Sequence, residues 1–179
     1  MRIIKLMMFI SSFFIVSTGY AGSSVDTEKF CKTQITKLTV YTKNDFELIS
    51  KSCDSESNPF IENTLVSKNQ KIFLNKYSMD GGDNPQKLAA VSVYKKKNSE
   101  PILITLHTQK WCCYPSPQGT VYSVDLYKIK KINNNIKIDP ITNILGENSS
   151  GLDGVSDEYL SFKFKDIASI KKWLEENYK

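Results

Sequence analysis

The sequence predicts an α+β fold: an antiparallel, meander-like sheet of five or six strands, covered on one face by a C-terminal helix and cross-linked by disulfides. Three observations support this prediction. Successive segments of alternating apolar residues are joined by short, turn-rich connections, which favours antiparallel neighbours. Near the C-terminus, apolar residues recur at helical spacing. An even number of cysteines follows a segment typical of export, which indicates disulfide bonds.

Residues 1–21 have the layout of a secretory signal peptide. A basic start precedes an almost uninterrupted apolar run over 6–16, and Gly19 and Ala21 supply the small residues expected before a cleavage site. The run is short for a bilayer span. We therefore expect a cleaved signal, a single globular domain over 22–179 with no membrane span, and a periplasmic or secreted location. A retained N-terminal anchor helix is the alternative.

The charge of the mature chain argues against one class of partner. After removal of the signal, lysines exceed acidic residues by three, and no arginine is left, because Arg2 is the only one in the chain. Arginine makes most bidentate contacts with phosphates and base edges. A nucleic-acid partner is therefore not expected. The lysines are typical of a solvated surface that can attract an acidic partner.

The N-terminal part of the mature chain predicts little regular structure. We expect a short helix that carries Cys31, followed by a strand over 35–41, where β-branched residues gather. Residues 46–49 are a further apolar piece. The polar stretch 50–58 is predicted to be a loop held by Cys53.

The middle of the chain predicts most of the sheet. Its apolar alternation is clearest in the two segments on either side of the adjacent cysteines, and the connections are rich in Gly, Asn, Asp and Ser. The predicted strands are 71–77, 87–95, 101–108, 120–131 and 134–138.

The C-terminal part predicts a loop, a strand and a helix. Glycines among Asn, Ser and Asp make 139–157 a long irregular loop of the kind that often carries function. Strand character returns over 159–164, with three apolar residues on one face: Leu160, Phe162 and Phe164. Asp166 then predicts the N-cap of an amphipathic helix over 167–177.

The mature chain contains four cysteines: Cys31, Cys53, Cys112 and Cys113. Three disulfide pairings are possible. One joins the first two cysteines and leaves a bond between the adjacent second two, and the others connect the N-terminal segment twice to the central strands. Because bonds between adjacent cysteines are uncommon, the double connection is the preferred prediction. A zinc site is not expected, since only one histidine could supplement the thiolates.

His107 is the only histidine, so any Cys-His or Ser-His mechanism would depend on it. On a strand it shares a face with Leu103 and Thr105, and we expect a partly exposed residue with no catalytic role. No hydrolase, metalloprotease or nucleotide-binding motif accompanies it. No catalytic residue and no cofactor are therefore predicted.

Two acidic clusters offer a calcium or acid–base site as an alternative. Asp80 and Asp83 flank two glycines, and Asp153, Asp157 and Glu158 surround a third. Neither cluster has EF-hand spacing, and Asp-Gly pairs also occur because they turn well. No metal site is predicted. A small envelope enzyme or calcium-binding protein that uses these carboxylates is the alternative.

The stretch between the two central strands concentrates aromatic residues, prolines and two cysteines. Trp111 and Tyr114 are of the types favoured at protein interfaces. They also suit a structural role in which Trp111 packs over a disulfide, and the structural role is the stronger of these two interpretations.

A cross-linked, exported scaffold without a catalytic motif is expected to act by binding. The first hypothesis is an inhibitor or immunity-type protein that occludes a partner toxin or hydrolase. A structural or accessory envelope protein that recruits its partner by strand addition is a further alternative. The loops 111–119 and 147–157 would form the binding surface, through Trp111, Tyr114, Gln118, Asn148, Asp153 and Asp157.

Overall fold

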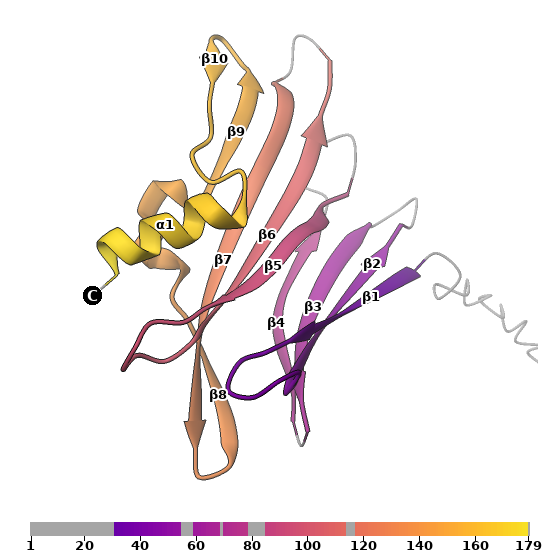
Figure 1. The fold of residues 1–179 in the computed structure, drawn as a ribbon. Coiled ribbons are helices and arrows are strands. Elements are labelled where there is room, and N and C mark those ends of the chain that lie inside the picture. The colour runs from indigo at the N-terminus through magenta and orange to yellow at the C-terminus, as the bar shows by residue number, and fades with distance from the viewer. Residues whose placement is uncertain (1–30, 55–58, 69, 79–84, 114–116, 179) are drawn as a thin grey trace, which may run out of the picture.

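The computed structural model describes residues 31–54, 59–68, 70–78, 85–113 and 117–178. The predicted signal peptide, most of the predicted N-terminal helix, the loop of Asp80 and Asp83, and Tyr114 lie outside these residues. The described chain forms two antiparallel sheets and a C-terminal helix (Figure 1). The predicted fold class is therefore confirmed, with a second sheet added to it.

The first sheet is a four-stranded meander in the order β1-β2-β3-β4. Its strands are β1 (Cys31–Leu38), β2 (Phe46–Cys53), β3 (Phe60–Ser67) and β4 (Lys71–Ser78). All neighbours are antiparallel. The sequence did not predict β3, and the prediction of a loop from residue 50 onward is wrong for 50–53, which complete β2. The prediction of a helix that carries Cys31 is wrong at that residue, because Cys31 is the first residue of β1 and pairs with Cys53.

The second sheet has six strands and is centred on the long strand β7. Its strands are β5 (Lys87–Tyr94), β6 (Ile102–Trp111), β7 (Gln118–Ile132), β8 (Asn135–Pro140), β9 (Ser150–Val155) and β10 (Tyr159–Leu160). All of β6 pairs with β7, and on the other side the two ends of β7 pair with β9 and β8. With 15 residues, β7 is long enough to serve both partners.

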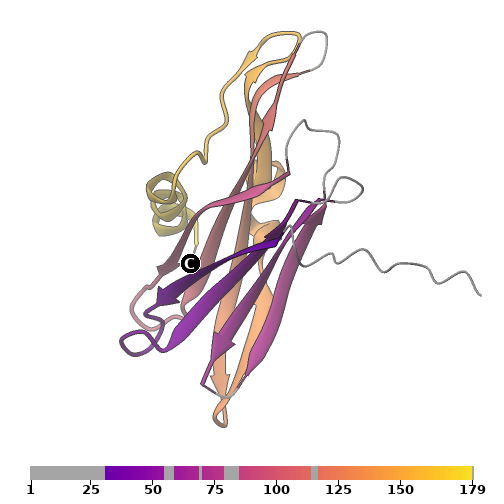
Figure 2. The same ribbon diagram turned by 90° about the vertical axis from the view of Figure 1, so that its right-hand side faces the viewer.

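The second sheet is the middle of three layers (Figure 2). On β6, Ile104 and Leu106 face helix α1 (Ile167–Asn177) and pack in its core. Leu103, on the opposite face of the same strand, packs against residues of the first sheet. Both faces of β6 are therefore buried, as the twofold alternation of a strand requires when it lies between two layers.

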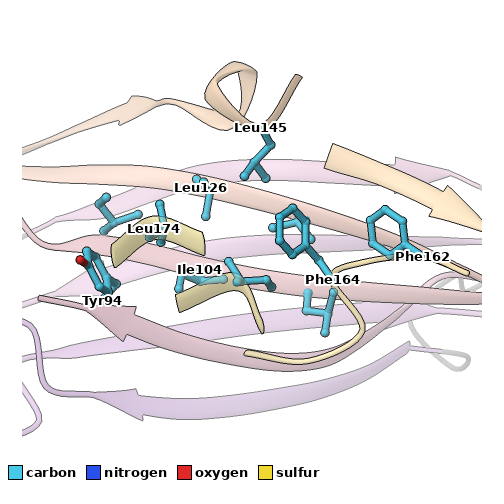
Figure 3. Packing of buried hydrophobic residues seen from close by; sticks show 11 residues of the cluster. Tyr94, Ile104, Leu126, Leu145, Phe162, Phe164 and Leu174 are labelled. Carbon is cyan, nitrogen blue, oxygen red and sulfur yellow. The ribbon is translucent and has the colours of Figure 1, made fainter. Parts of the chain in front are cut away.

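The core beneath α1 joins the helix to the sheet (Figure 3). Ile170, Leu174 and Phe164 are fully buried in it, together with Leu126 of β7. The predicted N-cap is confirmed, because the Asp166 carboxylate accepts a hydrogen bond from the backbone N–H of Ser169 at 2.7 Å. The helix thus starts where its apolar face first meets the sheet.

The prediction of an irregular loop over 139–157 is wrong. This segment contains the end of β8, a 3-10 segment η2 (Thr142–Ser149) and β9. Gly151 made it look flexible, but its missing side chain has a packing role: a Cβ there would collide with the ring of Phe162. Glycine at position 151 therefore leaves space for the Phe162 ring to pack against the strand.

The predicted strand 159–164 is only partly correct. Just Tyr159 and Leu160 pair, as β10, and Leu160 is 39% exposed whereas Phe162 and Phe164 are buried. The chain leaves the sheet after Leu160 and turns back over its face. There Phe162 stacks on Tyr122, with ring centroids 5.8 Å apart.

The preferred disulfide prediction is also wrong. The bonds are Cys31–Cys53 and Cys112–Cys113. Cys31 and Cys53 face each other in the register of β1 and β2, with their Cα atoms 4.0 Å apart. The other two cysteines follow the end of β6 in the second sheet. Strand pairing therefore places Cys31 beside Cys53, and Cys112 bonds to its neighbour in the chain.

Candidate functional site

Two features stand out as candidate sites: one end of the second sheet, and a buried polar cluster between the sheets. The first extends past the first sheet (Figures 1 and 2). There the register places Trp111 of β6 opposite Gly119 of β7, and Gln118 opposite Val155 of β9. Four consecutive strands therefore end side by side. We call this end the sheet tip and define it by Trp111, Cys112, Cys113, Gln118, Val155, Asp157, Tyr159 and Leu160.

Two glycines bring β7 and β9 into close contact at the sheet tip. Gly119 has φ +150° and faces Gly154 in the register. A Cβ on Gly119 would collide with the Asp153 carbonyl oxygen, and one on Gly154 would collide with the Gln118 carbonyl oxygen. Only glycine fits at both positions, so the two backbones can approach more closely than ordinary strands do.

The sheet tip exposes apolar groups. Val155, Tyr159 and Leu160 are 49%, 69% and 39% exposed. Cys112 and Cys113 are also exposed. Such an apolar group on strand ends, bordered by the exposed acidic turn of β9 and β10, is typical of a contact surface.

The structure brings four of the six predicted binding residues to this end of the sheet. Trp111, half-buried, donates from its indole Nε1 to Gln109 Oε1 at 3.3 Å, and Gln118 and Asp157 are exposed. Asp153 lies on the adjacent stretch of β9 and is engaged by Lys165 Nζ at 2.5 Å.

The other two predicted residues do not join them. Asn148 lies in η2, before the opposite end of β9, and its side-chain amide donates to the Leu145 carbonyl at 3.2 Å. Tyr114 lies outside the described residues.

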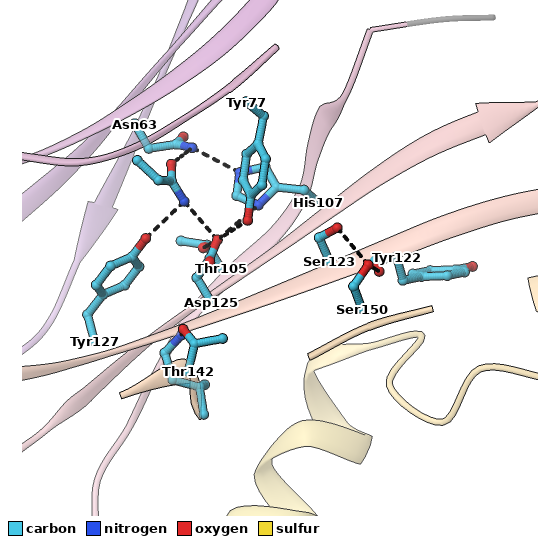
Figure 4. A network of polar contacts seen from close by, with 12 residues as sticks. Asn63, Tyr77, Thr105, His107, Tyr122, Ser123, Asp125, Tyr127, Thr142 and Ser150 are labelled. Atoms are coloured by element: carbon cyan, nitrogen blue, oxygen red, sulfur yellow. Dashed lines mark hydrogen bonds and ion pairs between the residues drawn. The ribbon is translucent and has the colours of Figure 1, made fainter. Parts of the chain in front are cut away.

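The second feature is a cluster of polar side chains in the space between the sheets (Figure 4). Its centre is Asp125 of β7, whose Oδ2 accepts hydrogen bonds from three side chains: Asn75 Nδ2 at 2.7 Å, Tyr77 Oη at 2.7 Å and Thr105 Oγ1 at 3.4 Å. Imidazole Nδ1 of His107 faces the same oxygen at 3.6 Å. The cluster joins β4 to β6 and β7 across the two layers.

The donors of the cluster fix one another in turn. An ionised Asp125 can only accept, so Asn75 must present its NH2 group to it and its Oδ1 to Asn63. Asn63 then donates from Nδ2 to Asn75 Oδ1 at 2.7 Å and to His107 Nε2 at 2.9 Å. Because Nε2 accepts, His107 is neutral and carries its proton on Nδ1, the nitrogen that faces the carboxylate.

Burial sets the protonation states in the cluster. His107 is 0% exposed, and desolvation lowers its pKa from 6.5 to about 4. Burial also raises the pKa of Asp125, against its hydrogen bonds from Tyr77, Thr105 and Asn75. The pKa values of Tyr77 and Tyr127 are raised by burial first and by the Asp125 charge second.

The expectation of a partly exposed histidine is therefore wrong. His107 points into the inter-sheet space because its strand is covered on both faces. Sequence reasoning also missed Asn63, Asn75 and Asp125. The available signal was polar residues at inward positions of predicted strands: Asp125 alternates in phase with Tyr127 and Ile129, which are buried on the same face of β7.

A groove of about 390 Å³ opens between the sheets next to this cluster. Two of its lining residues, Ser50 and Leu88, are the register partners of Asn63 and His107. Its charged residues are Lys32, Asp54 and Lys87. The groove is thus polar at its rim and reaches the strand positions adjacent to the cluster.

The described residues contain no group of three His, Cys, Asp or Glu side chains placed to hold a metal ion. Asp157 and Glu158 are exposed in the turn between β9 and β10, and Asp153 is paired with Lys165. Of the two acidic clusters, the one around Asp80 is outside the described chain.

Within the described part of the chain, no helix is both long and apolar enough to cross a membrane. Comparisons with protein-family models, with curated proteins and with solved structures found no match to this chain.

Proposed function

We propose that this chain is an exported protein of the inhibitor or immunity type, which occludes a partner toxin or hydrolase with its sheet tip. The observation that carries the proposal is the exposure of apolar groups on the ends of paired strands. Tyr159 is 69% exposed beside Val155 at 49%. Tyrosine supplies a large contact area with few rotatable bonds, which is why it is enriched among residues that dominate binding energy.

The sheet tip is built to be rigid before it meets a partner. Its strands are hydrogen-bonded in continuous register up to Trp111 and Val155. The ion pair between Lys165 and Asp153 ties β9 to the segment before α1. A preformed surface loses less conformational entropy on association, and this favours tight binding by occlusion.

Two further observations support an exported protein that works by binding. The signal-peptide layout agrees with the two disulfides, which persist best in an oxidising compartment. His107, in turn, is fully buried and its Nε2 is occupied by Asn63. In this arrangement it has no contact with solvent through which to take a proton from a substrate.

Partner capture with matched variants tests the proposal. The mature chain is immobilised and presented with an envelope extract of its native cells, alongside Tyr159→Ala, Asp157→Lys and Phe73→Ala. Phe73 is the control, because it is 61% exposed but lies on β4 of the first sheet. We expect wild type and Phe73→Ala to retain the same toxin or hydrolase and to inhibit it.

Tyr159→Ala should bind that partner at least about tenfold more weakly, while its melting temperature stays unchanged. Asp157→Lys should weaken binding too, since it reverses a charge at the edge of the contact. Unaltered binding by both variants, or full activity of the captured enzyme in the complex, would refute the proposal. A calcium-dependent rise in melting temperature would instead support a metal site.

A further inference from the structure

The two disulfides of this protein lie in very different surroundings. Cys31–Cys53 links two residues that face each other in the β1–β2 pair; Cys53 is 3% exposed and Cys31 is half-buried. Cys112–Cys113 lies beyond the last paired residue of β6, and both of its cysteines are exposed. A thiolate that opens a disulfide must reach one of its sulfur atoms, so exposure separates the two bonds chemically.

We propose that Cys112–Cys113 is a reactive site for thiol–disulfide exchange, whereas Cys31–Cys53 is a protected cross-link. The reactant class is a thiolate, on a small thiol or on another protein. The thiolate attacks the sulfur of Cys112 or Cys113 and forms a mixed disulfide, and the electron pair of the broken S–S bond leaves on the other cysteine as a thiolate.

The adjacent cysteine then completes the reaction. Its thiolate can attack the mixed disulfide and expel the incoming thiol, which restores the original bond. Alternatively, a second thiol of the reactant attacks: the two cysteines are then reduced to thiols by two electrons, and the reactant dithiol is oxidised to its disulfide. Because donor and acceptor sulfurs belong to neighbouring residues, no movement of the two sheets is needed for either outcome.

Opening this bond has a local structural consequence at the sheet tip. Cys113 has φ +81°, in the left-handed region that residues other than glycine rarely adopt. The covalent ring that joins it to Cys112 holds this conformation. Once the bond is broken, Cys113 relaxes toward negative φ, and the chain next to Trp111 changes its path. The paired parts of β6 and β7 are expected to stay in register, because their pairing ends at Trp111 and Gly119, before the two cysteines.

Selective reduction tests the proposal. The folded mature chain is incubated with increasing dithiothreitol, newly formed thiols are blocked with iodoacetamide, and the modified cysteines are identified by peptide mass spectrometry. We expect Cys112 and Cys113 to be modified at a dithiothreitol concentration at least about tenfold below that needed for Cys31 and Cys53. With glutathione in place of dithiothreitol, we expect a mixed disulfide on Cys112 or Cys113.

Trp111 provides a second measurement. The chain has two tryptophans, so Trp173→Phe leaves Trp111 as the only indole. Disulfides quench nearby indoles, and its fluorescence should rise at the low dithiothreitol concentration. The rise should be absent when Cys112→Ser and Cys113→Ser are added.

Two results would overturn the inference: reduction of both disulfides in parallel, or reduction of Cys31–Cys53 first. The exchange needs no protein partner, and its outcome is therefore separate from that of the capture experiment on the proposed function.

Discussion

The single histidine should make this protein less stable in mild acid. His107 is fully buried, and desolvation lowers its pKa from 6.5 to about 4 in the folded state. The unfolded chain, with the ordinary pKa, therefore binds more protons than the folded chain between pH 4 and pH 6.5. The stability that depends on a neutral His107 is fully present above pH 6.5 and is lost as the pH falls to about 4.

The size of the effect follows from these two pKa values. Crossing the whole interval changes the free energy of unfolding by about 3 kcal/mol, and going from pH 7 to pH 4.5 changes it by about 2 kcal/mol. Asp125 works in the opposite direction, because burial raises its pKa and the folded state then takes up a proton more readily than the unfolded one. Tyr77 and Tyr127 stay neutral throughout, since their pKa values are raised.

A variant that lacks only the imidazole isolates its contribution. Urea unfolding of wild type and His107→Gln at pH 7 and pH 4.5 should show that wild type loses about 2 kcal/mol more, since Asp125 is common to both. The imidazole also gives a single NMR titration curve, with an expected midpoint near pH 4. Equal losses in the two proteins, or a midpoint near 6.5, would show that His107 is solvated and does not lie buried in the cluster.

Three further outcomes can be checked by unfolding or exchange measurements. Replacing Cys31 and Cys53 by serine should lower the free energy of unfolding in urea by about 3 kcal/mol, because their bond spans a sequence separation of 22 and restricts the unfolded chain. An unchanged value would mean that the bond does not restrict the unfolded chain. Leu174→Ala should cost about 3 kcal/mol, since the side chain is fully buried, whereas Lys172→Ala on the exposed side of α1 should cost less than about 0.5 kcal/mol. Gly119→Ala should speed amide hydrogen exchange in β9, because its Cβ would collide with the backbone of that strand; protection equal to wild type would argue against the close approach.

The sequence was enough to predict an element correctly where one face of that element is purely apolar. Ile102, Ile104 and Leu106 alternate as the buried face of a strand does, and this face was predicted as it is found. The helix could also be predicted from the sequence, because Asp166 caps it and its buried residues recur at helical spacing. In both cases the element packs against a single apolar core, so its apolar residues recur at a regular spacing in the sequence.

The first sheet was difficult to predict from the sequence because polar residues lie on its inner face. Asn63 interrupts the apolar alternation of β3 and coincides with a register shift between Asn63 and Thr64. Ser50 interrupts the apolar alternation of β2 without a shift. Both are buried, but polar residues in a short segment look like a loop. What makes them interior residues is the hydrogen bonding supplied by other strands, which no local pattern reveals.

The candidate site was predicted in part, for a related reason. Trp111 and Gln118 lie on the two sides of one hairpin, and local sequence was enough to place them together. Asp157 joins them only because β9 pairs with β7, and the sequence around β9 looked like a flexible loop. Its glycines are in fact sites of close contact with a ring and with a neighbouring backbone. The contribution of β9 to the sheet tip therefore depends on tertiary contacts.

The space between the sheets combines an apolar part and a polar part, and this division bears on the sheet tip. Leu48, Leu65 and Leu103 pack in one apolar cluster, where the hydrophobic effect that stabilises them is non-directional. The polar part is selective, because sliding one sheet along the other by one residue would leave the Asp125 carboxylate, whose side chain is 16% exposed, without the donors from Asn75 and Tyr77. Leaving a buried carboxylate without its donors costs far more than shifting an apolar contact. We infer that the cluster fixes the second sheet relative to the first, and so lets the sheet tip extend beyond its support as a rigid surface.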